Sequence, residues 1–171
     1  IALAQKATDE KLLAVTISLI SEIGGAPDKF YLDMIERDID ADVKESCVEA
    51  LCDRAEHVKD ELLSRADSTD DLDKKELYAD ILTFCEAGDD RILELLRELL
   101  VTDDRVPYIA ELMGRYGDDR ACADLYKLLD TCTFAQFVEI RNAIEMMGGA
   151  VDEHYRDFSD DPLYKAYYGI K

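Results

Sequence analysis

The chain has 171 residues, of which 40 are Asp or Glu and 20 are Lys or Arg, so its formal net charge is −20 at pH 7. This charge repels nucleic acid phosphates and anionic lipid headgroups, and no stretch holds the roughly 18 uncharged apolar residues that a transmembrane helix needs. We therefore expect neither nucleic acid nor a membrane as a partner. The hydrophobic content of 48%, with only 3 Pro and 8 Gly, predicts a single, mostly helical domain over residues 1–171.

The cysteines follow no disulfide or metal-binding pattern. The 5 Cys lie at positions 47, 52, 85, 122 and 132, without a C-x-x-C spacing. We expect them to be buried, small apolar residues in a reducing compartment. This usage predicts a cytoplasmic location.

The first predicted helical hairpin spans approximately residues 8–38. Its first helix ends at Gly24-Gly25, and Pro27 suits the first turn of its second helix, where the missing N–H costs nothing. The second hairpin spans residues 40–67 and turns near Ala55. Because that turn lacks Gly, its boundary is less clearly marked.

The third predicted hairpin spans residues 70–100. Its first helix is expected to end at Gly88. Its second helix, Arg91 to Leu100, places leucines and one isoleucine on one side and Glu94 and Arg97 on the other, which is the pattern of an amphipathic helix.

The fourth predicted hairpin, residues 103–130, is the clearest copy. Asp103-Asp104 can cap its first helix, Gly117 supplies a permissive backbone for the turn, and Asp118-Asp119 can cap its second helix. The fifth hairpin spans residues 133–159, with a weaker second helix after its glycine turn. A C-terminal helix over residues 161–169 follows, as an end cap or as the start of a sixth repeat.

The turn residues indicate a repeat of about 31 residues. They are Gly24, Ala55, Gly88, Gly117 and Gly148, separated by 31, 33, 29 and 31 residues. Four positions earlier stand large apolar residues, namely Ile20, Leu51, Phe84, Met113 and Ile144. Five positions earlier stand Leu19, Ala50, Thr83, Leu112 and Ala143. Such recurring positions are expected where stacked hairpins pack against one another.

The fourth hairpin carries a recognisable residue pattern. Its members are Asp103, Arg105, Val106, Gly114, Gly117, Asp118, Arg120, Ala121, Leu128 and Leu129. The pattern resembles the HEAT repeat, particularly the short bacterial kind also found in phycobilisome-lyase proteins. The third and fifth hairpins match the pattern in part, and the assignment of the first two depends mainly on the repeat spacing. The resemblance implies an all-α, right-handed α-solenoid of about five hairpins, similar to HEAT and armadillo folds.

A solenoid of this kind is expected to be a non-enzymatic scaffold that binds a protein or peptide on its concave face. We expect the second helices to line that face. Their polar positions are Asp33, Glu36, Asp60, Ser64, Glu94, Arg97, Asp124 and Lys127. Because acids outnumber bases in this set, a basic partner is predicted, with affinity that falls as salt rises. Helix capping and a saline habitat remain alternative explanations of the acidity.

Aromatic residues gather near the C-terminus. They are Tyr155, Phe158, Tyr164, Tyr167 and Tyr168. A terminal hairpin lacks a neighbour on one side, so these side chains either cap the core or contact a partner or a further repeat.

A basic residue recurs near the start of each second helix. The series is Lys29, Lys59, Arg91, Arg120 and Arg156. It predicts either a row of positive charge that binds an acidic ligand or, as we favour, bonds from each basic residue to an Asp or carbonyl in its own turn.

The two histidines, His57 and His154, each follow a Glu. Deoxyhypusine hydroxylases are HEAT-like enzymes that bind iron with His-Glu pairs, but here the order is reversed and the two copies lie three repeats apart. We expect exposed histidines, and we predict no catalytic, metal-binding or cofactor-binding residue.

Two other functions remain open. A chromophore lyase-like subunit would hold a tetrapyrrole in the groove, as the resemblance to phycobilisome lyases implies. A passive spacer or regulatory segment of a larger protein is favoured by a chain that begins at Ile1 rather than Met.

Overall fold

The computed structural model describes residues 13, 15–17, 19, 20, 23, 26–101 and 104–170. All regular structure in these ranges is helical. The predicted Gly24-Gly25 turn and the predicted cap at Asp103 lie outside the described residues.

The described helices follow one another along the chain with short connections. They are α2 (Asp28–Ile35), α3 (Ala41–Cys52), α4 (Ala55–Asp67), α5 (Leu72–Leu82), α6 (Asp90–Leu99), α7 (Val106–Tyr116), the 3-10 helix η2 (Asp119–Ala121), α8 (Cys122–Leu128), α9 (Phe134–Met146) and α10 (Pro162–Tyr168). Nowhere in the described ranges does a helix combine the length and apolarity needed to cross a membrane.

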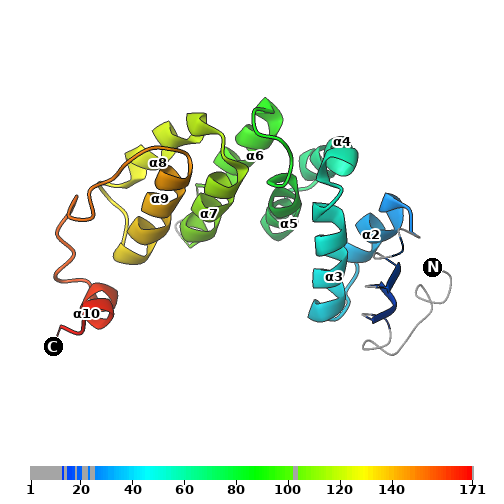
Figure 1. Cartoon of the computed structure of the whole chain (residues 1–171), viewed down its shortest axis with the longest axis horizontal. Coiled ribbons are helices and arrows are strands. Elements are labelled where there is room, and N and C mark those ends of the chain that lie inside the picture. The colour runs from blue at the N-terminus through cyan, green and yellow to red at the C-terminus, as the bar shows by residue number, and fades with distance from the viewer. Residues whose placement is uncertain are drawn as a thin grey trace.

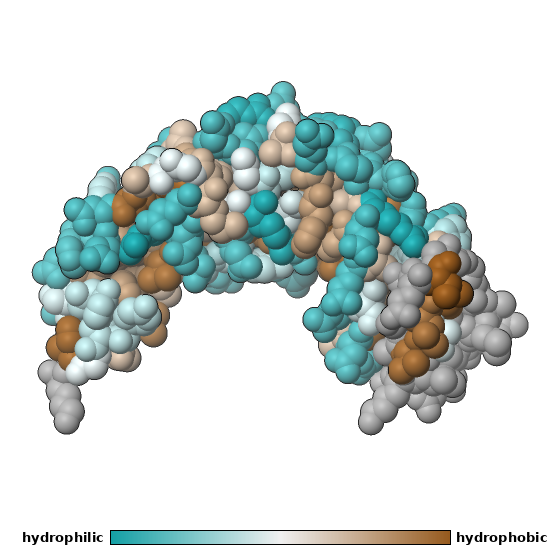
Figure 2. Space-filling model, viewed as in Figure 1, coloured by the Kyte–Doolittle hydropathy of each residue, from teal (hydrophilic) through white to brown (hydrophobic). Residues whose placement is uncertain are grey.

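The helices form an open arc, with α2 near one end and α10 at the other (Figure 1). Helices α3, α5, α7 and α9 lie along the inner side of the arc, and α4, α6 and α8 lie along its outer side. Figure 2 shows the same arc hollowed along its inner edge and mostly hydrophilic along its outer edge.

The predicted orientation of the hairpins is therefore wrong. In the second, third and fourth predicted hairpins, the first helix (α3, α5 or α7) lies on the inner side of the arc and the second helix (α4, α6 or α8) lies on its outer side. Most of the residues assigned to the concave face consequently lie on the outer helices. They are Asp60 and Ser64 on α4, Glu94 and Arg97 on α6, and Asp124 and Lys127 on α8. The physical reason is that both helices of a hairpin carry an apolar stripe, and a stripe shows which side is buried without showing which helix lies inside the curve.

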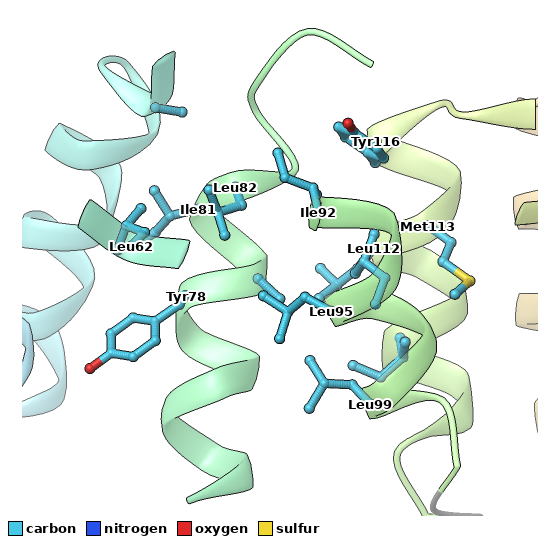
Figure 3. Packing of buried hydrophobic residues seen from close by; sticks show 14 of the residues in the cluster. Leu62, Tyr78, Ile81, Leu82, Ile92, Leu95, Leu99, Leu112, Met113 and Tyr116 are labelled. Carbon is cyan, nitrogen blue, oxygen red and sulfur yellow. The ribbon is translucent and has the colours of Figure 1, made fainter. Parts of the chain in front are cut away.

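The core runs along the arc between the inner and outer helices. Figure 3 shows Leu62 of α4, Ile81 of α5 and Ile92 of α6 pointing into it, and all three are fully buried. In α6, the predicted apolar side is buried and Glu94 and Arg97 are exposed, which confirms the amphipathic pattern. Each fully buried Leu or Ile contributes about 1.5–3 kcal/mol relative to an exposed one, so this core supplies most of the stability.

Ion pairs join the first four hairpins to one another in sequence. They connect Arg65 to Glu36, Arg91 to Asp60, Arg97 to Asp124, Arg105 to Glu76 and Arg120 to Asp90, with N–O distances of 2.5 to 2.9 Å. Four of these pairs link residues 29 to 31 positions apart, which is about one repeat. Exposed pairs contribute only about 0–1 kcal/mol each, so their main effect is to orient neighbouring helices.

Acidic side chains cap several helices, as the capping explanation of the acidity predicts. They are Asp40 at α3, Asp71 at α5, Asp89 at α6, Asp118 at η2 and Asp161 at α10. Helix α7 differs, because it begins after Arg105 without a side-chain cap, so Asp104 does not cap it. Gly117 ends α7 at φ 75°, the left-handed conformation expected at that turn.

The predicted second helix of the fifth hairpin is absent, since residues 147–161 are described and form only turns and bends. Asp152 accepts a hydrogen bond from the His154 backbone N–H, and Asp157 accepts one from that of Ser159, both at 2.8 Å. Such local bonds give the backbone an alternative to helix. The predicted C-terminal helix is present as α10.

Candidate binding groove on the inner side of the arc

The clearest departure from the repeat pattern occurs at Phe84. Leu51, Met113 and Ile144 occupy the equivalent sequence position in other hairpins, and all three are fully buried. Phe84 is instead 50% exposed. A large exposed aromatic side chain at a position that is otherwise part of the core needs a local explanation.

The explanation is the end of α5. This helix stops at Leu82, six residues before Gly88, whereas α7 runs up to Gly117. The prediction that the first helix of the third hairpin reaches Gly88 is therefore wrong. Phe84 lies in the turn beyond the helix, where its side chain no longer points into the core.

Phe84 lines a groove of about 720 Å³ between α3, the end of α5 and α7. These three helices lie on the inner side of the arc (Figure 1). Its lining residues are Ala41, Lys44, Glu45, Val48, Glu49, Cys52, Asp53, Asp80, Phe84 and Arg115. The apolar lining comes from Ala41, Val48 and Cys52 of α3 and from the Phe84 ring, and the other six lining residues are charged.

Arg115 holds the Phe84 ring in place. The centre of its guanidinium group lies 4.7 Å from the ring centroid, within the range of a cation–π contact. Its Nε donates a hydrogen bond to the Thr83 hydroxyl at 2.9 Å, and its Nη2 pairs with the Asp80 carboxylate. The Thr83 hydroxyl in turn donates to the Asp80 carbonyl at 2.6 Å. The aromatic wall of the groove is therefore preorganised.

Two titratable groups near Asp80, the Cys52 thiol and the Tyr108 phenol, have raised pKa values. Burial, followed by the nearby Asp80 carboxylate, raises the pKa of the Cys52 thiol to about 12. The same two causes raise the pKa of the Tyr108 phenol to about 12. At neutral pH Cys52 is thus a protonated thiol that contributes an apolar wall. Within the described ranges, no group of three or more His, Cys, Asp or Glu residues is arranged to hold a metal ion.

The rim of the groove carries excess negative charge. Glu45 and Glu49 line it from α3 and Asp53 from the C-cap of that helix, and Lys44 is the only base that α3 adds to the lining. Asp80 is neutralised by Arg115, so the acids of α3 determine the sign of the rim. Positively charged ligands are favoured at such a surface.

Most of the polar residues predicted to bind a partner form ion pairs within the chain. Asp60 pairs with Arg91 at 2.9 Å, and Asp124 pairs with Arg97 at 2.7 Å and with Lys127 at 2.8 Å. The two members near α2 are also engaged, because Arg65 of α4 pairs with Glu36 at 2.5 Å and with Asp33 at 3.7 Å. The structure does not gather the predicted set at one site.

Two members of the basic series bond within their own turns, as favoured. Arg91 donates to Asp89 at 2.8 Å, and Arg120 donates to Asp118 at 2.6 Å, each through Nη2. Their partners stand two residues earlier rather than one. Asp90, which directly precedes Arg91, accepts instead from Arg120 of the next repeat at 2.6 Å.

The exposure of the C-terminal aromatic residues, the histidines and the cysteines tests three other sequence predictions. Phe158 is buried against Phe134 with ring centroids 5.5 Å apart, and Tyr164 is half-buried, whereas Tyr155, Tyr167 and Tyr168 are exposed. The aromatic cluster therefore partly caps the core and partly faces solvent. Both histidines are exposed, as predicted. All five cysteines are free thiols, and Cys47, Cys85 and Cys132 are fully buried.

Sequence reasoning missed Phe84 and Arg115 as site residues. One signal was present, because Thr83 is the only polar member of its position in the repeat. Thr83 is buried and anchors Arg115, so a polar residue at a packing position marked the site.

Comparison of the chain with family models, with curated proteins and with solved structures gives no match.

Proposed function

We propose that this protein is a non-enzymatic scaffold that binds a protein or peptide, preferably a basic one, in the groove on the concave side of a right-handed, HEAT-like α-solenoid. The observation that carries the proposal is the half-exposed Phe84 ring, held by Arg115 at the centre of a groove of about 720 Å³.

The ion pairs between hairpins support a stacked repeat architecture. Arg91 reaches Asp60 of the preceding hairpin, and Arg120 makes the equivalent contact to Asp90. Regular stacking of similar hairpins places equivalent side chains one repeat apart, as these pairs require.

The groove has the features of a recognition site. Anchoring aromatic residues in preorganised pockets carry much of the affinity of protein interfaces, because little conformational entropy is lost when the partner binds. Arg115 and Thr83 preorganise Phe84 in this way. The acidic rim from α3 then favours a positively charged partner.

The test begins with selection of ligands from a random peptide library against the intact chain. Selected peptides are titrated against the unmodified protein and against Phe84→Ser. We expect the substitution to weaken binding at least tenfold, because an interface anchor is worth about 2 kcal/mol or more.

The matched control is Val101→Ser, which changes a 78% exposed apolar residue in the connection after α6. We expect this variant to bind the same peptides within twofold. Peptides that bind Phe84→Ser as tightly as the unmodified chain would show that the groove is not the binding site.

A further inference from the structure

The groove is bordered by a regular row of carboxylates. Glu45 and Glu49 on α3 and Asp53, the C-cap residue of that helix, stand at successive four-residue intervals, so they lie one above another on one side of the helix, about 6 Å apart. Val48 and Cys52 follow the same interval beside them and face the groove. The wall of the groove thus presents an apolar row and an acidic row in parallel.

These carboxylates differ from acids that are already paired with a base. Asp80, Asp90 and Asp124 each have an arginine partner within 4 Å. In the part of the chain that the structure describes, Glu45, Glu49 and Asp53 have no ion pair. Three adjacent like charges repel one another, and a cationic partner would relieve that repulsion.

Most of the backbone of the groove walls is already hydrogen-bonded. Apart from Asp53 and Phe84, the lining residues lie on helices α3, α5 and α7, whose internal N–H and C=O groups bond within each helix. An extended peptide laid against Val48, Cys52 and Phe84 would leave its own backbone groups without partners there. A helical peptide satisfies its backbone internally and presents only side chains.

We propose that the occupant of the groove is a basic amphipathic helix of a partner protein, lying along α3; this proposal rests on the proposed function. Its apolar side chains, at i, i+3 and i+4 spacing, contact Val48, Cys52 and Phe84. Its Lys or Arg residues, one turn apart, pair with Glu45, Glu49 and Asp53.

The test uses synthetic peptides of about 18 residues, long enough for helices that pack on a surface. The first is an amphipathic Leu/Lys helix. The second replaces every Lys by Glu, the third carries a central proline pair that breaks the helix, and the fourth has the same composition in an order without amphipathicity. Fluorescence anisotropy measures binding of each labelled peptide to the intact chain at two salt concentrations.

We expect the amphipathic basic helix to bind at least tenfold more tightly than the other three peptides. The triple variant Glu45→Gln/Glu49→Gln/Asp53→Asn should bind it about tenfold more weakly, with a reduced salt dependence, since three exposed ion pairs are lost. Circular dichroism verifies that each variant keeps its helix content.

The matched control removes the same charge from the outer side. The variant Asp67→Asn/Glu94→Gln/Asp119→Asn changes three exposed acids of α4, α6 and η2 that have no ion pair within the described ranges. It should keep affinity for the basic helix within twofold. Equal weakening by both triple variants would show attraction to the net charge alone and would overturn the proposal.

The outcomes separate this inference from the proposed function. If the basic helix fails to bind while library-selected peptides bind in a Phe84-dependent manner, the groove is a binding site and the helical, basic occupant is wrong. If no peptide depends on Phe84, the proposed function fails and this inference fails with it.

Discussion

Asp118 combines deep burial with three hydrogen bonds from one residue. Asp118 is 5% exposed. Its carboxylate accepts hydrogen bonds from the Arg120 backbone N–H, Nε and Nη2 at 3.1, 2.9 and 2.6 Å. The Arg120 side chain is the main cause that lowers the pKa of Asp118 below its ordinary value of 3.8. The turn between α7 and η2 is thus fixed by one carboxylate.

Replacing Asp118 by Ala should therefore lower the free energy of unfolding at pH 7 by about 2 kcal/mol, since a helix cap and charge-assisted hydrogen bonds are lost together. Urea unfolding measures the change. Asp119→Ala is the control, because Asp119 is exposed and has no side-chain partner among the described residues. We expect that variant to differ from the unmodified chain by less than about 0.5 kcal/mol.

The same residue predicts a pH dependence. Because folding lowers the pKa of Asp118, its stabilising contribution is fully present above the ordinary value of 3.8 and is lost as pH falls through the lowered value. The stability difference between the unmodified chain and Asp118→Asn should stay constant from pH 7 to pH 5 and shrink below about pH 4. A difference that is equal at pH 7 and pH 3 would show that folding does not lower the pKa of Asp118.

At the scale of elements, α7 and α9 approach each other at Gly114. A Cβ atom on Gly114 would lie 2.9 Å from the Ala143 Cα and 3.2 Å from the Met146 sulfur. Helix propensity alone favours Ala over Gly by about 1 kcal/mol, whereas overpacking a core costs about 1–3 kcal/mol. The net effect on stability is unfavourable, because the closest contact is with a backbone Cα atom, which cannot move aside as the end of a side chain can.

We predict that Gly114→Ala lowers the free energy of unfolding by about 1 kcal/mol, the difference between these two effects. Thermal and urea unfolding measure it. A Gly114→Ala protein more stable than the unmodified chain would mean that the two helices are not in close contact at this point.

Elements could be predicted from sequence where the apolar period and the local turn chemistry agree. Helix α6 shows both, with Asp89 as its cap and one continuous apolar side. The second helix of the fifth hairpin was predicted from apolar residues alone, while Asp152 and Asp157 stabilise turns in the same segment. The length of α5 was also misjudged, because Gly88 lies just before the next helix rather than at the end of α5.

At the scale of the whole molecule, the arc is more extended than a compact chain. A compact protein of this length has a radius of gyration of roughly 16 Å. We predict a clearly larger value from small-angle X-ray scattering, with a distance distribution skewed toward long distances. A value near that of the compact case would contradict the open arc of Figure 1.

The repeat period indicated that hairpins stack, but it left the inner face undetermined. Residues of the inner and outer helices show the same periodicity, and the direction of curvature depends on small differences in packing summed over the chain. The candidate site was hidden for a related reason. Phe84 fits the apolar pattern of its position, and only the early end of α5 exposes it.

The central claim is that a ligand lies in the groove between α3, Phe84 and Arg115. Amide chemical shifts of the ¹⁵N-labelled chain, followed during titration with the amphipathic basic helix, test it most directly. The account predicts that the largest shift changes fall within residues 41–53 and at Phe84 and Arg115. Largest changes on the outer helices α4, α6 and α8, or small changes spread evenly over the chain, would contradict it.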